Sequence, residues 1–188
     1  TLPPLRGNRL AVVSRSGGHA VIATDACSHY GFHLPRLPEA ILKKVENRLR
    51  AHVIRLQNPL DLGDLFELEF YENIVEELLK TEDLDGILLA HGYRRGFEER
   101  ASRILVGRVE KLVEKYQKPV GLVILADTVE IDYLKKNTAI PVFTAPETSM
   151  RAFHLSHKWT TAAKLQALDS KALPGVDNRK AEEIIRAG

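Results

Sequence analysis

The chain has 188 residues, with 27 lysines and arginines against 25 aspartates and glutamates, and a formal net charge of +2. This balance predicts neither a nucleic acid nor a membrane surface as partner, and the absence of an apolar stretch of about 18 residues predicts no transmembrane helix. The length suits one domain of ordinary size. The single cysteine, Cys27, and an N-terminus without the apolar stretch of a signal peptide favour a cytoplasmic protein.

The segment 9–24, RLAVVSRSGGHAVIAT, joins an apolar run to a helical pattern through two glycines. Leu10–Ser14 predicts a buried strand, and a helix is expected from Gly18 to about Tyr30, with Gly31 as its C-terminal cap. Such a strand–glycine turn–helix unit aims backbone N–H groups at one point, where phosphate or carboxylate can bind. The turn matches neither the dinucleotide motif nor the nucleoside-triphosphatase motif, so it predicts an anion site of modest specificity.

Short apolar runs alternate with helical patterns along the following residues, which predicts right-handed βαβ units and a parallel sheet. Further strands are expected at 32–37, 84–90, 120–125 and 141–143. Helices are expected at 38–49, 65–79, 98–116, 128–136 and 146–168. The segment 57–64 is rich in turn residues and is interpreted as a loop that follows Val53 and Ile54. The chain therefore predicts an α/β domain with five strands.

The last twenty residues break the periodic pattern. Pro174 and Gly175 mark a linker, and Asp177 is placed to cap a final helix over 178–187 whose apolar positions have no evident partner. We therefore divide the chain into a domain over 1–168 and a linker with the start of a following segment over 169–188.

Several motifs in this order resemble the nucleoside-diphosphate-forming acyl-CoA synthetases, a superfamily that includes the succinyl-CoA synthetases. The motifs are a G-N-R lead-in, a strand ending in Gly-Gly, a Thr-Asp pair, N-P-x-D-L-G and D-G-I-L-L. In this sequence they stand at 7–9, 17–18, 24–25, 58–63 and 85–89. The resemblance covers roughly residues 4–164 and is strongest to the second flavodoxin-like ligase domain. It implies a three-layer α/β/α fold with strand order 2-1-3-4-5.

The resemblance also implies a function. In this family a CoA-binding domain, two flavodoxin-like domains and an ATP-grasp domain convert acyl-CoA, phosphate and ADP into acid, CoA and ATP through a phosphohistidine. The present module would supply a helix N-terminus that holds phosphate or the phosphohistidine, with Ser16, Gly17, Gly18, His19 and Ala20 as the phosphate-binding residues. The other domains or subunits would be its partners. CoA, ATP or ADP and Mg would belong to the parent enzyme, and no cofactor would bind to this module alone.

The phosphorylated histidine itself has no counterpart here, because that residue belongs to the preceding flavodoxin-like domain of the family. The turn also departs from the usual Gly-Gly-Pro-Gly, since His19 and Ala20 follow the two glycines. His19 is either a tolerated exposed residue at the helix start or a neutral donor to a bound phosphate, because a helix N-terminus disfavours its cationic form.

Four residues outside the turn form a candidate secondary rim: Asn58, Asp61, His91 and Arg94. His91 stands at the carboxyl end of a central strand, where ligands collect in open α/β sheets, and Arg94 and Arg95 can fork onto phosphate. A solvated loop is the competing interpretation. Asn58 and Asp61 have turn formation as their competing role, and Asp127 and Thr128 read more simply as a helix N-cap.

We expect no catalytic residue and no metal site. The other histidines are scattered, and His154 and His157, although on one helix face, lack a third ligand nearby. No nucleophile elbow or Cys–His arrangement is present, which predicts an isolated module without turnover.

Two alternatives remain open from the sequence. The first is a noncatalytic interaction or regulatory domain with a vestigial anion site. The second is a free flavodoxin-like nucleotide binder, which is weakened by the lack of an acidic residue placed for a ribose.

Overall fold

The computed structural model describes residues 2–49, 56–63 and 65–169. Five parallel strands form one sheet in the order β2-β1-β3-β4-β5, which confirms the predicted order. The strands are β1 (Leu10–Ser14), β2 (Leu60–Asp61), β3 (Gly86–Gly92), β4 (Val120–Leu125) and β5 (Val142–Phe143). Because every strand runs the same way, all carboxyl ends meet at one side of the sheet, called the carboxyl edge below.

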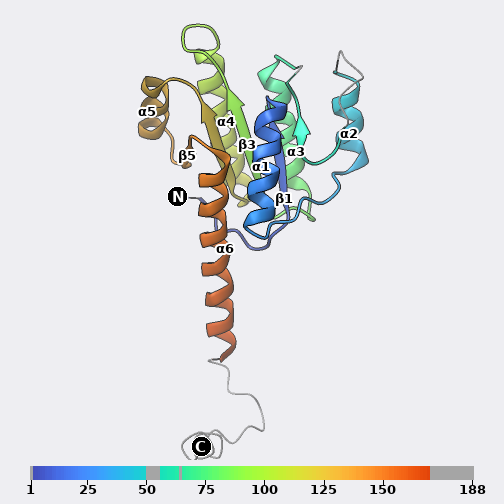
Figure 1. Ribbon diagram of the computed structural model, residues 1–188, viewed down its shortest axis with the longest axis vertical. Helices are drawn as coiled ribbons and strands as arrows, with labels where there is room; N and C mark the ends of the chain where they lie inside the picture. The colour runs from blue at the N-terminus through green and yellow to red at the C-terminus, as the bar shows by residue number, and fades with distance from the viewer. Residues whose placement is uncertain (1, 50–55, 64, 170–188) are drawn as a thin grey trace, which may run out of the picture.

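Helices cover both faces of this sheet. The helices are α1 (Gly17–His29), α2 (Glu39–Glu46), α3 (Leu68–Lys80), α4 (Glu99–Tyr116), α5 (Thr128–Asn137) and α6 (Pro146–Asp169). Alternate strand residues point to opposite faces, so Leu10 and Val12 pack with α1 and α6, whereas Ala11 and Val13 pack with α2, α3 and α4. The result is a three-layer α/β/α fold of the flavodoxin type (Figure 1).

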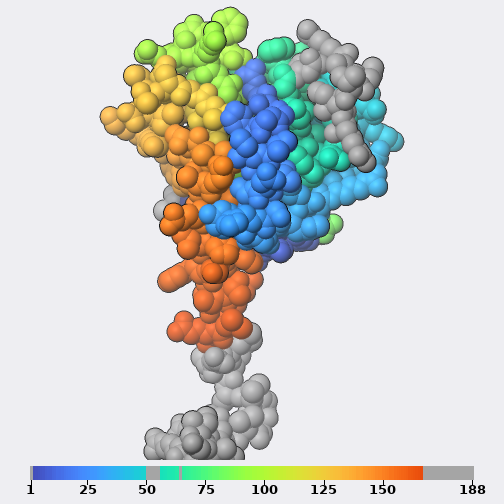
Figure 2. Space-filling view, in the orientation of Figure 1, coloured from blue at the N-terminus to red at the C-terminus, as the bar shows by residue number. Residues whose placement is uncertain are grey.

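Helix α6 is longer than the sheet that it covers. Phe153 is its last side chain in the core, and the helix then continues past the body of the domain (Figures 1 and 2). Trp159 on this extension is 77% exposed. The predicted linker and final helix over 170–188 lie outside the described residues, as do Val53 and Ile54.

The predicted second strand over 32–37 is wrong. That segment makes one isolated bridge, between Arg9 and His33, and Pro35 beyond it has no N–H to continue a ladder. The edge strand is instead β2, which lies inside the segment interpreted as a loop. It pairs Leu60 with Val13 and Asp61 with Ser14.

The predicted third strand ends too early. His91 and Gly92 belong to β3 and pair with Ile124 and Leu125 of β4. The apolar run that predicts this strand ends at Ala90, whereas the ladder with β4 extends over His91 and Gly92. The remaining elements begin and end within a few residues of their predicted limits, and Gly31 after α1 has φ +77°, as expected of a C-terminal cap.

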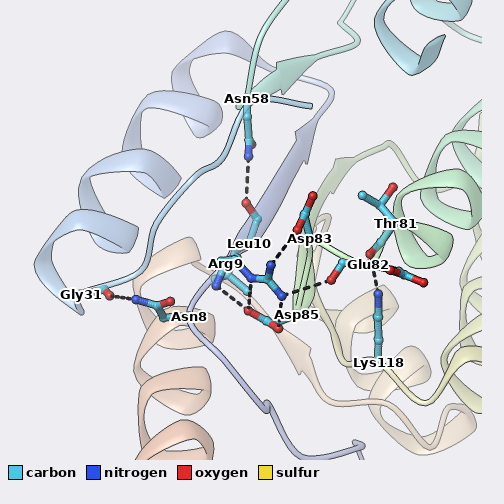
Figure 3. A network of polar contacts seen from close by, with 10 residues as sticks. All are labelled: Asn8, Arg9, Leu10, Gly31, Asn58, Thr81, Glu82, Asp83, Asp85 and Lys118. Atoms are coloured by element: carbon cyan, nitrogen blue, oxygen red, sulfur yellow. Dashed lines mark hydrogen bonds and ion pairs between the residues drawn. The ribbon is translucent and has the colours of Figure 1, made fainter. Parts of the chain in front are cut away.

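Two of the family motifs meet at the amino edge of the sheet, opposite the carboxyl edge (Figure 3). Asp85 accepts hydrogen bonds from the backbone N–H of Arg9 at 2.9 Å and from its Nε at 3.1 Å. A Cβ on Gly7 would lie 2.3 Å from the Asp85 carboxylate, so only glycine fits there. The G-N-R and D-G-I-L-L motifs are therefore explained by one structural contact.

Candidate functional site

The glycine turn lies at the carboxyl edge, between β1 and α1. The buried Ser14 hydroxyl accepts a hydrogen bond from Ser16 N at 3.0 Å and donates one to Ser16 O at 2.8 Å. Ser16 is the N-cap, with extended backbone (φ −150°, ψ 124°) and no side-chain capping bond. Its hydroxyl is thus not used to cap the helix, and Ser14 fixes the conformation of the turn.

The first turn of α1 leaves its backbone donors open. Ala20 N bonds to Ser16 O at 2.9 Å, and within the described ranges no acceptor meets the N–H groups of Gly17, Gly18 and His19. Both glycines are exposed, and the first turn carries no acidic side chain. Unpaired N–H groups at a helix N-terminus attract an anion.

His19 is half-buried, and its Nδ1 atom is buried with no hydrogen-bond partner among the described residues. Its ring therefore has an unused nitrogen beside the open end of α1.

Asp61 brings a negative charge to this turn. Its Oδ1 accepts from Gly63 N at 2.9 Å, and its Oδ2 lies 3.0 Å from the position that a Cβ on Gly17 would occupy. A carboxylate near a helix N-terminus is favourable for the helix but repels a second anion. Asp61 therefore lies beside the glycine turn, where its charge would oppose the binding of a fully charged phosphate.

Arg15 ties the glycine turn to the β3–α4 loop. Its guanidinium forks onto the Glu98 carboxylate at 3.0 and 3.2 Å and also donates to Gly92 O at 3.1 Å. The Arg15 side chain is 10% exposed and that of Glu98 is 21% exposed, so the pair is largely shielded from solvent. A bidentate pair of this kind has a defined geometry. Sequence reasoning missed it, because nothing in the spacing of the two residues indicates a contact.

Asn58 does not reach the carboxyl edge. Its side chain accepts from Val12 N at 3.0 Å and donates to Leu10 O at 2.8 Å and to Pro35 O at 3.0 Å. The amide therefore takes the place of strand backbone along the first part of β1. This is a structural role, and no donor of the Asn58 side chain remains for a ligand.

His91 is not on the exposed rim. Its side chain is fully buried, with Nε2 at 2.9 Å from Ser102 Oγ, and its ring stacks on Tyr93 at a centroid distance of 5.2 Å. Because β3 extends to Gly92, the ring points into the helix layer rather than from a loop. Burial, with a smaller effect of the Arg15 charge, lowers the pKa of His91 to about 3.

We expect His91 to make the domain less stable as the pH falls. The unfolded chain takes up this proton near pH 6.5 and the folded chain only near pH 3, so stability is lost between these values. From pH 7 to pH 5 the loss attributable to His91 is about 2 kcal/mol. Urea unfolding at both pH values measures it. His91→Gln should remove that part of the difference, whereas the exposed His29→Gln should not; an equal pH response in all three proteins would contradict the assignment.

The β3–α4 loop presents Arg94 to solvent. Its side chain is exposed and makes no ion pair within the described residues. The neighbouring Arg95 instead bonds to Asp127 at 3.0 Å, and Asp127 also caps α5 through Glu130 N. Of the four predicted rim residues, Asp61 and Arg94 are thus at the carboxyl edge with surface-accessible side chains, while Asn58 and His91 serve the core.

The part of the chain that the structure describes contains no group of three or more His, Cys, Asp or Glu side chains placed to hold a metal ion. His154 Nδ1 lies 3.1 Å from Tyr30 O, so this histidine has a structural partner. None of the described helices is both long enough and apolar enough to cross a bilayer.

Comparisons with known proteins show which proteins this chain resembles in sequence and in fold. No protein-family model matches the chain. The alpha subunit of acetate–CoA ligase (ADP-forming) I from Pyrococcus furiosus is 26% identical over 164 residues, which are 85% of this chain and 34% of that subunit. Acetate–CoA ligase (ADP-forming) I from Archaeoglobus fulgidus is 25% identical over 96% of this chain and 25% of its own length. In sequence, the chain is therefore similar to one part of these ADP-forming acetate–CoA ligases.

The fold of this chain agrees with solved structures. A crystal structure from Pyrococcus horikoshii OT3 superposes with a TM-score of 0.70 and 22% identity, over 85% of this chain and 37% of that one. The acetyl-coenzyme A synthetase 1 of Ca. Korarchaeum cryptofilum, solved in complex with phosphate and ADP, gives a TM-score of 0.69 at 19% identity, over 92% of this chain and 37% of that one. The chain spans about a third of the length of the relatives that it matches.

Proposed function

We propose that this chain is the module of an NDP-forming acyl-CoA synthetase whose α1 N-terminus receives phosphate or a phosphohistidine carried by another domain. The observation that carries the proposal is the open end of α1, where the N–H groups of Gly17, Gly18 and His19 have no acceptor among the described residues. The ADP-forming names of the relatives support the reaction class.

The overall reaction in the parent enzyme is then acyl-CoA, phosphate and ADP to acid, CoA and ATP, in either direction. CoA and the nucleotide bind to other domains, with Mg as the ion that accompanies the nucleotide. The present module contributes binding and orientation. Backbone N–H groups fixed by the Ser14 hydroxyl stabilise negative charge without reorganising, which is how preorganised donors act in phosphoryl transfer.

The charge of Asp61 affects which anion the glycine turn would bind. A carboxylate beside the turn repels inorganic phosphate, but it can accept a hydrogen bond from a ligand that carries both an anion and an N–H donor. A phosphorylated imidazole that is protonated on its second ring nitrogen is such a ligand. The pairing of open backbone donors with a neighbouring carboxylate therefore favours phosphohistidine over free phosphate as the group received.

Phosphate titration of the 188-residue chain, followed by amide NMR, tests this function. We expect the amide signals of Ser16 to Ala20 to shift, with a chloride titration at equal ionic strength as control. Gly18 has room for a side chain, since a Cβ would meet only Ser16 Oγ at 3.8 Å. Gly18→Asp should weaken phosphate binding roughly tenfold relative to the neutral Gly18→Asn, because it adds a like charge at the site.

Asp61→Asn is the opposite change. It removes the negative charge but keeps the Oδ1 acceptor for Gly63 N, and it should strengthen phosphate binding several-fold. Complete indifference of the Ser16 to Ala20 amides to phosphate, in both the unmodified chain and Asp61→Asn, would overturn the proposal and favour a noncatalytic interaction domain with a vestigial anion site.

A further inference from the structure

A groove on the α3–α4 face begins at the tip of the β3–α4 loop. Phe97 at this tip is 87% exposed, which is the largest value for a bulky apolar side chain in the described part of the chain. Two adjoining hollows, of about 500 and 270 Å³, lie along the starts of α4 and α3 and share Ile104 between them. Phe66, which is 66% exposed, lines the second hollow.

Three exposed apolar side chains thus line the two hollows: Phe97, Ile104 and Phe66. Exposed aromatic anchors beside a preformed hollow are the usual anatomy of a protein-binding site. A hollow lined by apolar side chains is the kind of surface that takes the apolar face of an amphipathic helix.

The charge around Phe97 indicates the chemistry of the partner. Arg100 lines the first hollow with Phe97, and Arg94 lines a neighbouring hollow on the loop that Phe97 also borders. Neither arginine side chain has an ion-pair partner within residues 2–49, 56–63 and 65–169. The other arginines of the groove are neutralised, since Arg103 pairs with Glu130 at 2.7 Å and Arg108 pairs with Glu72 at 2.6 Å. The Phe97 end therefore carries two cations that are unpaired among the described residues, whereas Glu69 and Glu72 line the hollow at the Phe66 end.

A second copy of the chain fits this charge poorly. In a two-fold symmetric dimer the same patch faces itself, so Arg94 and Arg100 of one copy would approach those of the other. A partner helix with carboxylates near its apolar anchor satisfies both features.

The groove is also connected to the proposed anion site. Glu98 follows Phe97 in the loop and holds the guanidinium of Arg15, which directly precedes the glycine turn. A helix bound at Phe97 would therefore contact the loop whose Glu98 is joined through Arg15 to the glycine turn.

We propose that this groove binds an acidic amphipathic helix of another domain of the same synthetase, with Phe97 as the apolar anchor and Arg94 and Arg100 as the partners of its carboxylates. The proposal rests on the proposed function for the existence of that other domain, but it concerns residues other than Ser16 to Ala20, where phosphate is proposed to bind.

Photocrosslinking in the intact synthetase tests the assignment. Phe97 is replaced by p-benzoylphenylalanine, the purified enzyme is irradiated, and the crosslinked peptides are identified by mass spectrometry. We expect one major crosslink, to an acidic helix of another domain. The same photoreactive residue at the exposed Trp159 is the positional control and should give a different product or none.

Charge variants test the role of the arginines. The double variant Arg94→Glu, Arg100→Glu should lower the crosslink yield roughly tenfold, since two favourable rim contacts become repulsive. The single variant Arg100→Lys keeps the positive charge and should give a yield well above that of the double variant. Lys111→Glu, exposed on the same helix outside the groove, should leave the yield unchanged.

A crosslink to a second copy of this chain, a crosslink to a basic or uncharged segment, or no crosslink at Phe97 would each overturn the proposal. The phosphate titration is independent of this experiment. Phosphate-induced shifts at Ser16 to Ala20 without a crosslink at Phe97 would contradict the helix-binding groove and leave the proposed function intact. A crosslink at Phe97 without those shifts would contradict the proposed function and leave the groove proposal intact.

Discussion

Asp85→Asn should destabilise the domain by about 3 kcal/mol, because it removes the charge of a largely buried carboxylate that accepts three hydrogen bonds from Arg9. The Asp85 side chain is 14% exposed and receives the Arg9 backbone N–H and two guanidinium nitrogens. Burial raises the pKa of Asp85, but the hydrogen bonds and charge of Arg9 outweigh it and leave that pKa lowered. Urea unfolding at pH 7 measures the effect.

Asp83→Asn is the matched control for this change. Asp83 also contacts Arg9, at 3.0 Å, but its side chain is 87% exposed, so its loss should cost about 0.5 kcal/mol or less. Similar losses of unfolding free energy in both variants would contradict the larger contribution assigned to Asp85. Gly7→Ala should destabilise for a steric reason, since its Cβ would displace the Asp85 carboxylate.

Asn58→Ala should cost about 3 kcal/mol, because it leaves Val12 N, Leu10 O and Pro35 O without their partners. Asn58→Asp should be at least as harmful, since the carboxylate keeps the bond from Val12 N but faces two carbonyl oxygens. The adjacent, exposed Gln57→Ala is the control and should be close to neutral. Thermal and urea unfolding measure all three.

The Asn58 variants also separate a structural motif from a binding motif. If Asn58 serves only the sheet, a folded fraction of Asn58→Ala at low temperature should bind phosphate with unchanged affinity. A selective loss of phosphate binding with unchanged stability would contradict the hydrogen-bond arrangement described above and return Asn58 to the ligand rim.

The alternation of strands and helices around a parallel sheet could be predicted from the sequence pattern, because β1, β3 and β4 are continuous apolar runs and α3 and α4 have clear apolar faces. The three layers and the strand order were implied by the family resemblance. The sequence pattern failed at the edge strand. β2 has two residues, and a side chain from Asn58 does the hydrogen bonding that a longer strand would otherwise do. No pattern of hydrophobicity reports a side chain that replaces backbone.

The candidate site was predictable in part for a similar reason. The glycine turn depends on local sequence, and its geometry at the start of α1 follows from that sequence. Arg15 and Glu98 are 83 positions apart, and His91 was misplaced because its burial depends on where the ladder to β4 ends. Contacts of this kind depend on the tertiary packing of segments that are distant in the sequence, and local periodicity does not indicate them.

The extension of α6 determines how this domain can be tethered. Leu5 N bonds to Ser156 Oγ at 3.1 Å, so the first described residues lie beside the part of α6 that is leaving the body. From Phe153 to Asp169 the helix rises by about 24 Å at 1.5 Å per residue, away from the carboxyl edge (Figure 1). Both ends of the described chain therefore lie away from the glycine turn, and neither covers the open N-terminal end of α1 (Figure 1).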